Sequence, residues 1–235
     1  MPRVKINYSQ DEREIIYTES RWMVLKQKRE LVKNVCKPFI DSGIPIIIYG
    51  SVARGNVKPS SDLDILVNVF IPSYKIELLL ESYNMQIIGR EIVQATPNEI
   101  IKGHIYLNDD VCITFFLTRI KDINFEFYKF GGAINYGELL KDKRVSGIDK
   151  SLTIIIPTEK GHREVPLINN EKLASDLIGI SPQIIEIRKR VLLKRDRVGR
   201  TGIFLRWNLD PSETFEEALK RISDKNPIVK KKFLK

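Results

Sequence analysis

Histidine and cysteine are scarce in this chain, which has two of each among 235 residues. Two cysteines cannot build the disulfide framework of a small secreted domain, so we expect Cys36 and Cys112 to be reduced thiols in a cytoplasmic protein. His104 and His162 stand alone, without the ligand spacing of a zinc site. These shortages exclude a disulfide scaffold and a zinc module.

Long apolar runs are also missing. The longest, "IPIIIY" and "LDILVNVFI", fall well short of the roughly eighteen residues that span a membrane. The first residues contain no apolar segment of the kind found in signal peptides, so we expect neither a signal peptide nor a membrane partner. With 43% hydrophobic residues, the chain can nevertheless bury a core.

Positive charge is in excess, at +9 overall, and it is unevenly placed. Residues 186–235 contain fifteen Lys and Arg against seven Asp and Glu, a net charge of +8 that leaves +1 for residues 1–185. A basic end on a nearly neutral body indicates a polyanionic partner such as nucleic acid. The alternative is a charged surface that only keeps the protein soluble. The sequence does not indicate an oligomeric state.

One segment carries recognisable chemistry: "GSVARGNVKPSSDLDILV", residues 50–67. Asp62 and Asp64 occupy alternate positions of an expected strand, so they face the same side with Cα atoms about 7 Å apart. Two such carboxylates repel each other, and Mg²⁺ (or Mn²⁺) relieves the repulsion while accepting substrate phosphates. Gly50 lets a phosphate approach the backbone N–H groups that begin at Ser51, and the residues "VARG" that follow are consistent with one helical turn. The segment therefore predicts a phosphate site beside a metal site.

The same residues resemble the signature of the DNA polymerase β-type nucleotidyltransferase superfamily, especially its minimal archaeal and bacterial members. The pattern is Gly-Ser, Ala-Arg-Gly, then Ser-Asp-x-Asp and an aliphatic strand, matched closely over residues 45–69 and loosely over 20–118. The resemblance implies an α+β fold with a mixed sheet and helices on one side. It also implies transfer of a nucleoside monophosphate from an NTP to an acceptor hydroxyl, with two metal ions.

The resemblance assigns roles to residues of the segment. Gly50 and Ser51 would hold the triphosphate, and Asp62 and Asp64 would hold the metals and act in catalysis. The remaining candidates for nucleotide binding are Arg54 and Ser61. Arg54 is alternatively a solvent-facing turn residue.

The family's third carboxylate, which activates the acceptor hydroxyl, lacks a clear counterpart. The matching strand is "VCITFFL", with Cys112 and Thr114 where that carboxylate would lie. Asp110, just before this strand, is the substitute that we consider, and it is either the catalytic group or a turn residue of a β-hairpin around "LNDD". Loss of a general base costs about 10²–10⁴ in rate. The alternative to an enzyme is therefore a catalytically weak nucleotidyltransferase-fold protein that regulates by binding DNA or RNA.

We expect three consecutive parts: a nucleotidyltransferase-like domain at 1–130, a connector at 131–160 and a basic, mainly helical accessory domain at 161–235. Within the basic domain, residues 169–179 and 181–195 resemble a helix-turn-helix followed by a wing at "VGRTGIFLRW". The alternative is a helical domain whose basic face is merely soluble. The side chains that a winged helix would present to nucleic-acid phosphates are Arg188, Lys189 and Arg190.

Proline positions predict two helix ends. A helix covering residues 19–36 should be closed by Pro38 and then by "DSGIP" at residues 41–45, because proline cannot donate a helical hydrogen bond and glycine with proline marks a loop. Another should begin with Asp210 as its N-cap, Pro211 as its first residue and Glu213 in a capping box.

Overall fold

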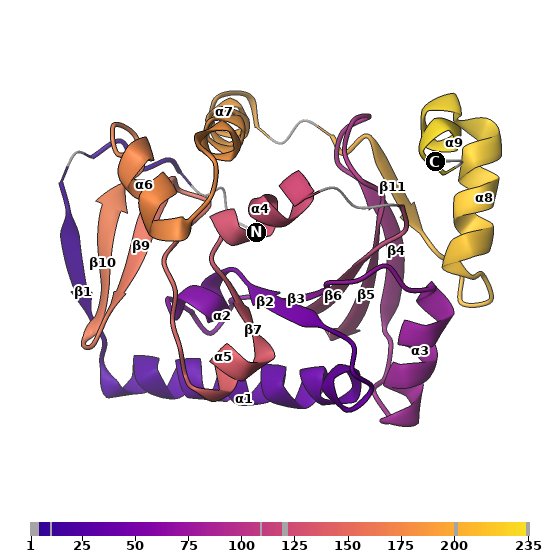
Figure 1. The fold of residues 1–235 in the computed structure, drawn as a ribbon, viewed down its shortest axis with the longest axis horizontal. Helices are drawn as coiled ribbons and strands as arrows, with labels where there is room; N and C mark the ends of the chain where they lie inside the picture. Colours follow the sequence, from indigo (N-terminus) through magenta and orange to yellow (C-terminus); the bar gives the residue numbers. More distant parts are fainter. Residues whose placement is uncertain (1–4, 10, 109, 119–121, 200–201, 234–235) are drawn as a thin grey trace. The chain divides into compact units, whose positions relative to one another are not determined.

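The structure is a computed structural model that describes residues 5–9, 11–108, 110–118, 122–199 and 202–233 (Figure 1). It divides into two compact units, each assembled from separate stretches of chain. Unit 1 comprises residues 1–34, 48–63 and 122–201, and unit 2 comprises residues 35–47, 64–121 and 202–235. The predicted limits of three consecutive parts remain a prediction.

Helix α1 (Glu19–Asp41) has residues in both units and continues past Pro38. Of the two expected helix stops, Pro38 was wrong, whereas the segment "DSGIP" does contain the end of the helix. Phe39, in the last turn, is fully buried, and its burial offsets part of the cost of the backbone hydrogen bond that proline forfeits. The helix ends at Asp41, and Gly43 follows with a φ of +67° that suits glycine, while the Ile44 N–H is bonded to the Phe39 carbonyl at 2.8 Å.

Unit 1 contains a four-stranded antiparallel sheet in the order β1-β10-β9-β8. Its strands are β1 (Arg13–Ile16), β8 (Gly147–Ile148), β9 (Thr153–Thr158) and β10 (Gly161–Pro166). Ile154 of β9 and Val165 of β10 share a buried cluster with Ile185 of the basic helix described below. Strands β9 and β10 form an antiparallel pair in which Val165 lies opposite Ile154.

The other elements of unit 1 are mostly helical. They are α2 (Ser51–Arg54), α4 (Asp122–Phe130), β7 (Ala133–Asn135), α5 (Tyr136–Leu140), α6 (Glu171–Ile178) and α7 (Pro182–Val198). The two helices predicted for residues 169–195 are thus present. They are separated by Gly179, whose φ is +67°. The segment expected as a connector also has regular structure, because Asn135 and Glu138 form a capping box that starts α5.

The larger sheet has the order β11-β4-β5-β6-β3-β2-β7, and β2 (Ile46–Tyr49) and β3 (Leu63–Val67) each have residues in both units. Its unit 2 strands also include β4 (Gly89–Gln94), β5 (Lys102–Asn108), β6 (Val111–Phe116) and β11 (Leu205–Asn208). The predicted β5–β6 hairpin is confirmed. The expected α+β class with a mixed sheet is also confirmed.

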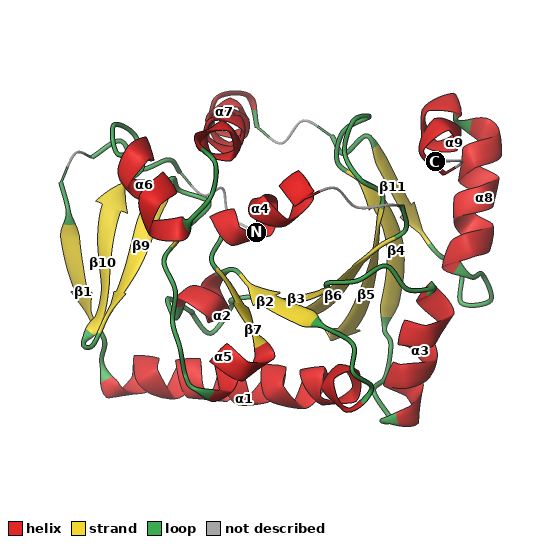
Figure 2. Cartoon of the chain, viewed as in Figure 1, coloured by secondary structure: helices red, strands yellow, loops and turns green. Residues whose placement is uncertain are grey.

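Unit 2 has helices α3 (Ser73–Ser82), α8 (Phe215–Lys225) and α9 (Pro227–Phe233) (Figure 2). The rings of Phe215 on α8 and Phe115 on β6 meet edge to face with centroids 4.9 Å apart. Successive side chains of a strand alternate between faces, so Cys112 and Thr114 lie on the face opposite Phe115. None of the described helices combines the length and the apolar character needed to cross a membrane.

Two predictions about the C-terminal third change. The expected wing contains β11, which pairs with β4 (Arg206 opposite Val93) and extends the larger sheet, so the winged helix is not confirmed. Helix α8 begins at Phe215 rather than after Asp210, and its capping box joins Thr214 to Glu217. Asp210 instead accepts hydrogen bonds from the backbone and hydroxyl of Ser212, which is a local turn.

Candidate functional site

The backbone of residues 50–55 is shaped by two glycines. Gly50 follows β2 with φ +82° and ψ −144°, a conformation that strongly favours glycine, and its N–H donates to the Gly132 carbonyl at 2.9 Å. Ser51 begins α2, and Gly55 (φ +87°) ends it by donating its N–H to the Ser51 carbonyl at 2.8 Å. The predicted helical turn at "VARG" is therefore confirmed, and its geometry requires both glycines.

Arg54 is a buried residue of this turn, with only 6% of its surface exposed, so the solvent-facing alternative was wrong. Its guanidinium donates through Nη1 to the Gly131 carbonyl and through Nε to Asn56 Oδ1 at 3.1 Å. A Cβ at Gly132 would lie 2.7 Å from Arg54 Cγ. Arg54 thus packs against the turn at residues 131–132, to which Gly50 is bonded.

Ser61 closes the loop that leads into the aspartates. Its hydroxyl accepts from the Lys58 N–H at 2.8 Å, and its own N–H donates to the Lys58 carbonyl at 2.9 Å. The Ser61 carbonyl accepts from Lys28 Nζ on α1 at 3.0 Å. Sequence reasoning missed Lys28, because no local pattern indicates that this lysine reaches a loop thirty-three residues away.

Asp62 directly precedes β3, and Asp64 is the second residue of that strand. Both are partly buried. Within the described ranges, no hydrogen-bond or ion-pair partner of Asp62 is found. Burial and then the negative charge of Asp64 raise the pKa of the Cys112 thiol to about 12. Cys112 of β6 is therefore close enough to Asp64 to sense its charge, and it stays a neutral thiol at pH 7.

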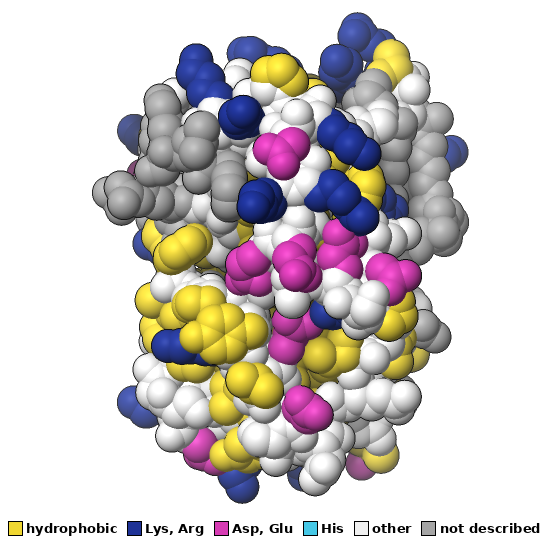
Figure 3. Space-filling view, turned by 90° about the vertical axis from the view of Figure 1, so that its right-hand side faces the viewer, with side chains coloured by type: hydrophobic (Ala, Val, Ile, Leu, Met, Phe, Trp, Pro, Cys, Tyr) yellow, Lys and Arg dark blue, Asp and Glu magenta, His cyan; other side chains and the backbone are white. Residues whose placement is uncertain are grey.

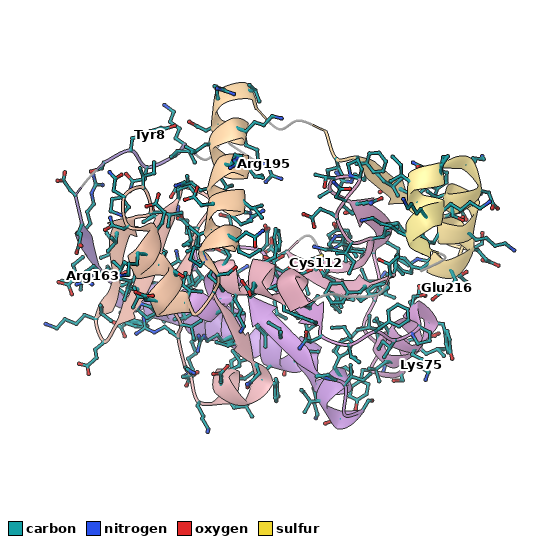
Figure 4. All side chains as sticks on the ribbon, turned by 45° about the horizontal axis from the view of Figure 1, so that its top comes forward. Tyr8, Lys75, Cys112, Arg163, Arg195 and Glu216 are labelled. Atoms are coloured by element: carbon teal, nitrogen blue, oxygen red, sulfur yellow. The ribbon has the colours of Figure 1, made fainter. Side chains whose placement is uncertain are left out.

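The β6 face lacks the third carboxylate that the family pattern would supply. Cys112 (labelled in Figure 4) and Thr114 occupy it instead. Cys112 Sγ and Thr114 Oγ1 lie 3.3 and 3.0 Å from His104 Nδ1. Burial lowers the pKa of His104 to about 4, so its ring is neutral at pH 7. Over the residues with described positions, no three His, Cys, Asp or Glu side chains are grouped to hold a metal ion.

A buried carboxylate that the sequence did not single out lies on β4. Glu91 accepts from the Tyr106 hydroxyl at 2.5 Å and from Arg206 Nε at 2.7 Å, one partner on each of its oxygens. These partners come from β5 and β11, the two neighbours of β4. The geometry is that of an interstrand ion pair, which ties β11 to the sheet.

Asp110 lies in the turn between β5 and β6. The side chain of Asn108 accepts from the N–H groups of Asp110 and Val111 at 2.9 Å each, which forms a local turn. This placement is that of a hairpin residue. A catalytic role for the Asp110 carboxylate stays a prediction.

The three residues predicted to bind nucleic acid all lie on α7, and the side chains of two of them contact other side chains of the protein. Arg188 stacks on Phe127 of α4, with its guanidinium carbon 4.2 Å from the ring centroid. Lys189 contacts Glu171 and Glu186 at 2.6 Å each; burial lowers its pKa, but these carboxylates raise it above the ordinary value overall. Of the three, Arg190 is exposed, whereas Arg188 and Lys189 are partly buried.

Comparison with known families assigns the segment that holds the aspartate pair. Residues 28–122 match the family described as nucleotidyltransferase domain. The chain carries a nucleotidyltransferase domain of the polymerase β-type superfamily. The match runs from Lys28 on α1 through the glycine turn, the aspartates and β6 to residue 122, where α4 begins. No curated protein and no solved structure gave a significant match.

The match supports nucleotidyl transfer as the general activity of the nucleotidyltransferase domain. Domains of this kind generally use a divalent metal ion and an NTP. Asp62 and Asp64 fit that requirement, since both are partly buried and Asp62 has no partner among the described residues. Mg²⁺ takes one or two carboxylates from the protein and completes its shell with waters and substrate phosphates.

Proposed function

We propose that this chain is a metal-dependent nucleotidyltransferase that transfers a nucleoside monophosphate from an NTP to an acceptor hydroxyl. The observation that carries the proposal is the geometry of residues 50–64. Gly50 directly precedes Ser51, and its backbone conformation favours glycine. Asp62, which has no partner among the described residues, directly precedes the strand that contains Asp64. The family match supplies the reaction class.

In this proposal Gly50 and Ser51 bind the triphosphate, and Asp62 and Asp64 hold Mg²⁺ or Mn²⁺. When bound, the metal would neutralise phosphate charge and orient the leaving group. Lys28 adds positive charge at the carbonyl that precedes Asp62. Arg54 and Ser61 act by fixing the turn and the loop, since their described contacts are to neighbouring backbone and side chains.

A second candidate function is a nucleotide-binding regulator with weak turnover, and the β6 face favours it. The face carries the neutral thiol of Cys112, and a histidine with a pKa of about 4 is a poor base at pH 7. Asp110 is the proposed base if the chain is an enzyme. The two candidates differ in turnover, not in nucleotide binding.

Radiolabelled NTPs distinguish these candidates. The protein is incubated with each NTP labelled on the α-phosphate and with a pool of RNA and DNA, in Mg²⁺, Mn²⁺ or EDTA. Labelled polymer that requires metal and vanishes in Asp62→Asn supports the enzyme, whereas metal-dependent NTP binding without product supports the regulator. Asp176→Asn, at an exposed aspartate of α6, is the control. Absence of NTP binding would overturn both.

We further propose nucleic acid as the acceptor or partner, through an exposed basic face of α7. The carboxylates that engage Lys189 exclude it from this face, and the stacking of Arg188 on Phe127 does the same for Arg188. Arg195 projects from α7 (Figure 4). The exposed cations of this helix, named here the α7 basic face, are Arg190, Lys194, Arg195 and Arg197.

The basic charge of α8 and α9 is less suited to phosphate binding. Figure 3 shows Asp and Glu side chains in a band across the face that carries these helices, with Lys and Arg above. Arg221 of α8 is paired with Glu213 at 2.6 Å, and the first turn of α8 contains Glu216 and Glu217. Interspersed acids lower the local potential that attracts phosphates, so α7 is the better candidate.

A further inference from the structure

Apart from the aspartate pair, Tyr17, between β1 and α1, is hydrogen-bonded to the turn at residues 50–55 that is proposed to bind nucleotide. Tyr17 is only 6% exposed, and its hydroxyl lies 3.0 Å from the Gly55 carbonyl. The same hydroxyl lies 2.8 Å from Nδ1 of His162, which is 1% exposed. His162 Nε2 is 3.2 Å from Glu164 Oε1. A chain of four groups therefore runs from the end of α2 to a carboxylate on β10.

The hydrogens in this chain can be counted. A tyrosine hydroxyl has one hydrogen, so Tyr17 donates either to the Gly55 carbonyl or to His162, not to both. If His162 is neutral with its hydrogen on Nε2, it donates to Glu164, and Nδ1 then takes the Tyr17 hydrogen. If His162 is protonated on both nitrogens, it donates to Tyr17 and to Glu164, and Tyr17 donates to Gly55. All three contacts with an ionised Glu164 are hydrogen bonds only in the protonated form.

Gly55 is firmly enclosed, so its carbonyl contact matters for the turn. A Cβ at Gly55 would lie 2.3 Å from Arg144 Cδ. Arg144 is itself fixed by hydrogen bonds to the carbonyls of Gly161 and Thr158 at 2.8 and 2.5 Å. The Gly55 N–H bonds to the Ser51 carbonyl, so a shift of the Gly55 peptide passes directly to Ser51.

We propose that Tyr17 is a positioning residue for the turn at Gly50 and Ser51, and that the protonation of His162 decides whether Tyr17 holds Gly55. Protonated His162 directs the Tyr17 hydroxyl to the Gly55 carbonyl, and neutral His162 draws it away. The proposal deepens the nucleotide-binding role of this turn and rests on it.

The charged groups around His162 set where it titrates. Burial lowers the pKa of His162, Glu164 raises it, and Arg21 and Arg54 lower it again, with a net lowering. On the strands that flank β10, Ile15 and Pro157 lie opposite His162 and carry no charge. Burial raises the pKa of Tyr17, while Arg21, Arg144 and Arg54 oppose this, so its hydroxyl keeps its hydrogen near neutral pH. Neutral His162 should therefore prevail at pH 7, with Tyr17 held on Gly55 in more acidic solution.

The first test uses the ligand-free protein. Only two histidines are present, so His104→Asn assigns the ring ¹⁵N signals, and a pH titration then follows the His162 tautomer. We expect an Nε2–H ring at high pH, a doubly protonated ring at low pH, and a Gly55 carbonyl ¹³C shift with the same midpoint that disappears in Tyr17→Phe. An Nδ1–H ring at high pH, or a Gly55 shift without that midpoint, would overturn the proposal.

The second test measures the affinity for Mg²⁺–NTP across pH as the ratio of variant to parent, which cancels titration of the nucleotide. Loss of one hydrogen bond, about 0.5–1.5 kcal/mol, corresponds to about 2- to 10-fold weaker binding by Tyr17→Phe at low pH. This ratio should approach one at high pH. The His162→Gln variant has no titrating group at this position. The ratio of its Mg²⁺–NTP affinity to the affinity of Tyr17→Phe should therefore not change with pH. Tyr83→Phe, which removes a hydroxyl bonded to Asp41 in unit 2, should match the parent throughout.

The outcomes separate this proposal from the proposed function. A Tyr17→Phe ratio that stays constant with pH contradicts the positioning role even if nucleotide binds. Absence of NTP binding by the parent contradicts the proposed function, and the ring and carbonyl titrations then decide alone whether Tyr17 exchanges between Gly55 and His162.

Discussion

Residues 50–64 and helix α7 are both proposed to meet phosphates, but they hold their polar groups in different ways. In residues 50–64 the groups are fixed by the backbone, through the left-handed φ of Gly50 and the two-residue spacing of Asp62 and Asp64. In α7 the positive charges lie at the ends of long Lys and Arg side chains, and contacts with neighbouring elements determine which of these charges are accessible. Arg188 lies on Phe127 and Lys189 is bound by two carboxylates. A site formed by residues close together in the chain can be recognised as a sequence pattern. Whether a charged side chain is accessible depends on tertiary contacts, which the sequence pattern does not show.

The largest effect should come from the backbone-fixed region. Asp62→Asn and Asp64→Asn should each reduce metal-dependent NTP binding by more than about 100-fold, since loss of an outer-shell partner alone costs about 10–100-fold in metal affinity. Removing one of two neighbouring carboxylates relieves repulsion, so the free energy of unfolding should hold or rise. Isothermal titration with Mg²⁺–NTP and urea unfolding measure the two quantities. Asp176→Asn should bind like the parent, and wild-type affinity in both active-site variants would remove the proposed metal site.

The α7 comparison is tested by two double variants that each remove two positive charges. If both cations contact phosphate, Lys194→Gln with Arg195→Gln should lower the log–log salt slope of nucleic-acid binding by about 1.4 on single strands or 1.8 on duplex DNA. At 50 mM salt the affinity should fall by about 100-fold. Arg188→Gln with Lys189→Gln should leave the slope nearly unchanged. Salt titrations with duplex DNA, single-stranded DNA and structured RNA provide the measurement.

Equal slope changes in the two double variants would show that engaged and exposed cations bind alike. Absence of binding to all three nucleic acids at low salt would contradict the nucleic-acid proposal. Circular dichroism controls for folding, because Arg188 also packs against Phe127.

The sequence predicted the parts of the fold that depend on neighbouring residues. The β5–β6 hairpin, the one-turn helix at residues 51–54 and the strand that begins at Leu63 all lie where the pattern placed them. Each is specified by turn residues or by apolar alternation within a few positions. The roles of Asp62 and Asp64 in metal binding remain predictions, although their strand is confirmed.

The errors arose where distant contacts outweigh local signals. Pro38 is a strong local stop, yet burial of Phe39 carries α1 past it. The capping motif at Asp210 competes with another at Thr214, and the latter starts α8. The wing suggested for "VGRTGIFLRW" is not confirmed, because the strand in this segment, β11, pairs with β4, more than one hundred residues earlier in the chain. Local patterns carry no information about such a partner.

A smaller effect should separate one backbone donor from the rest of the nucleotide-binding turn. Ser51 is the first residue of α2, where the fixed φ of proline is tolerated. Ser51→Pro should therefore keep the helix but remove one N–H and one hydroxyl, and weaken NTP binding about 10-fold, the equivalent of one charge-assisted hydrogen bond. Ser51→Ala, which keeps the N–H, should weaken binding less. Equal affinity of Ser51→Pro and the parent would place the phosphates elsewhere.

The smallest effect concerns the engaged cation of α7. Burial raises the pKa of Glu171, but the hydrogen bond from Lys189 and its charge hold it below the ordinary value overall. A carboxyl whose pKa is lower in the folded state stabilises the fold above its unfolded pKa and loses that contribution as pH falls through its folded pKa. Glu171→Gln should thus reduce the free energy of unfolding by about 0.5–1 kcal/mol at pH 7 and by almost nothing at pH 3, as expected for a partly exposed ion pair.

Urea unfolding at both pH values measures this difference, and Glu186→Gln, at the more exposed partner of Lys189, should change it less. The same variants should leave nucleic-acid affinity close to that of the parent apart from a small gain from the lost negative charge. If Glu171→Gln costs no stability but increases the salt slope by about 0.7–0.9, one further phosphate contact has formed. Lys189 would then belong to the α7 basic face, and the distinction between engaged and exposed cations would depend on a single weak ion pair.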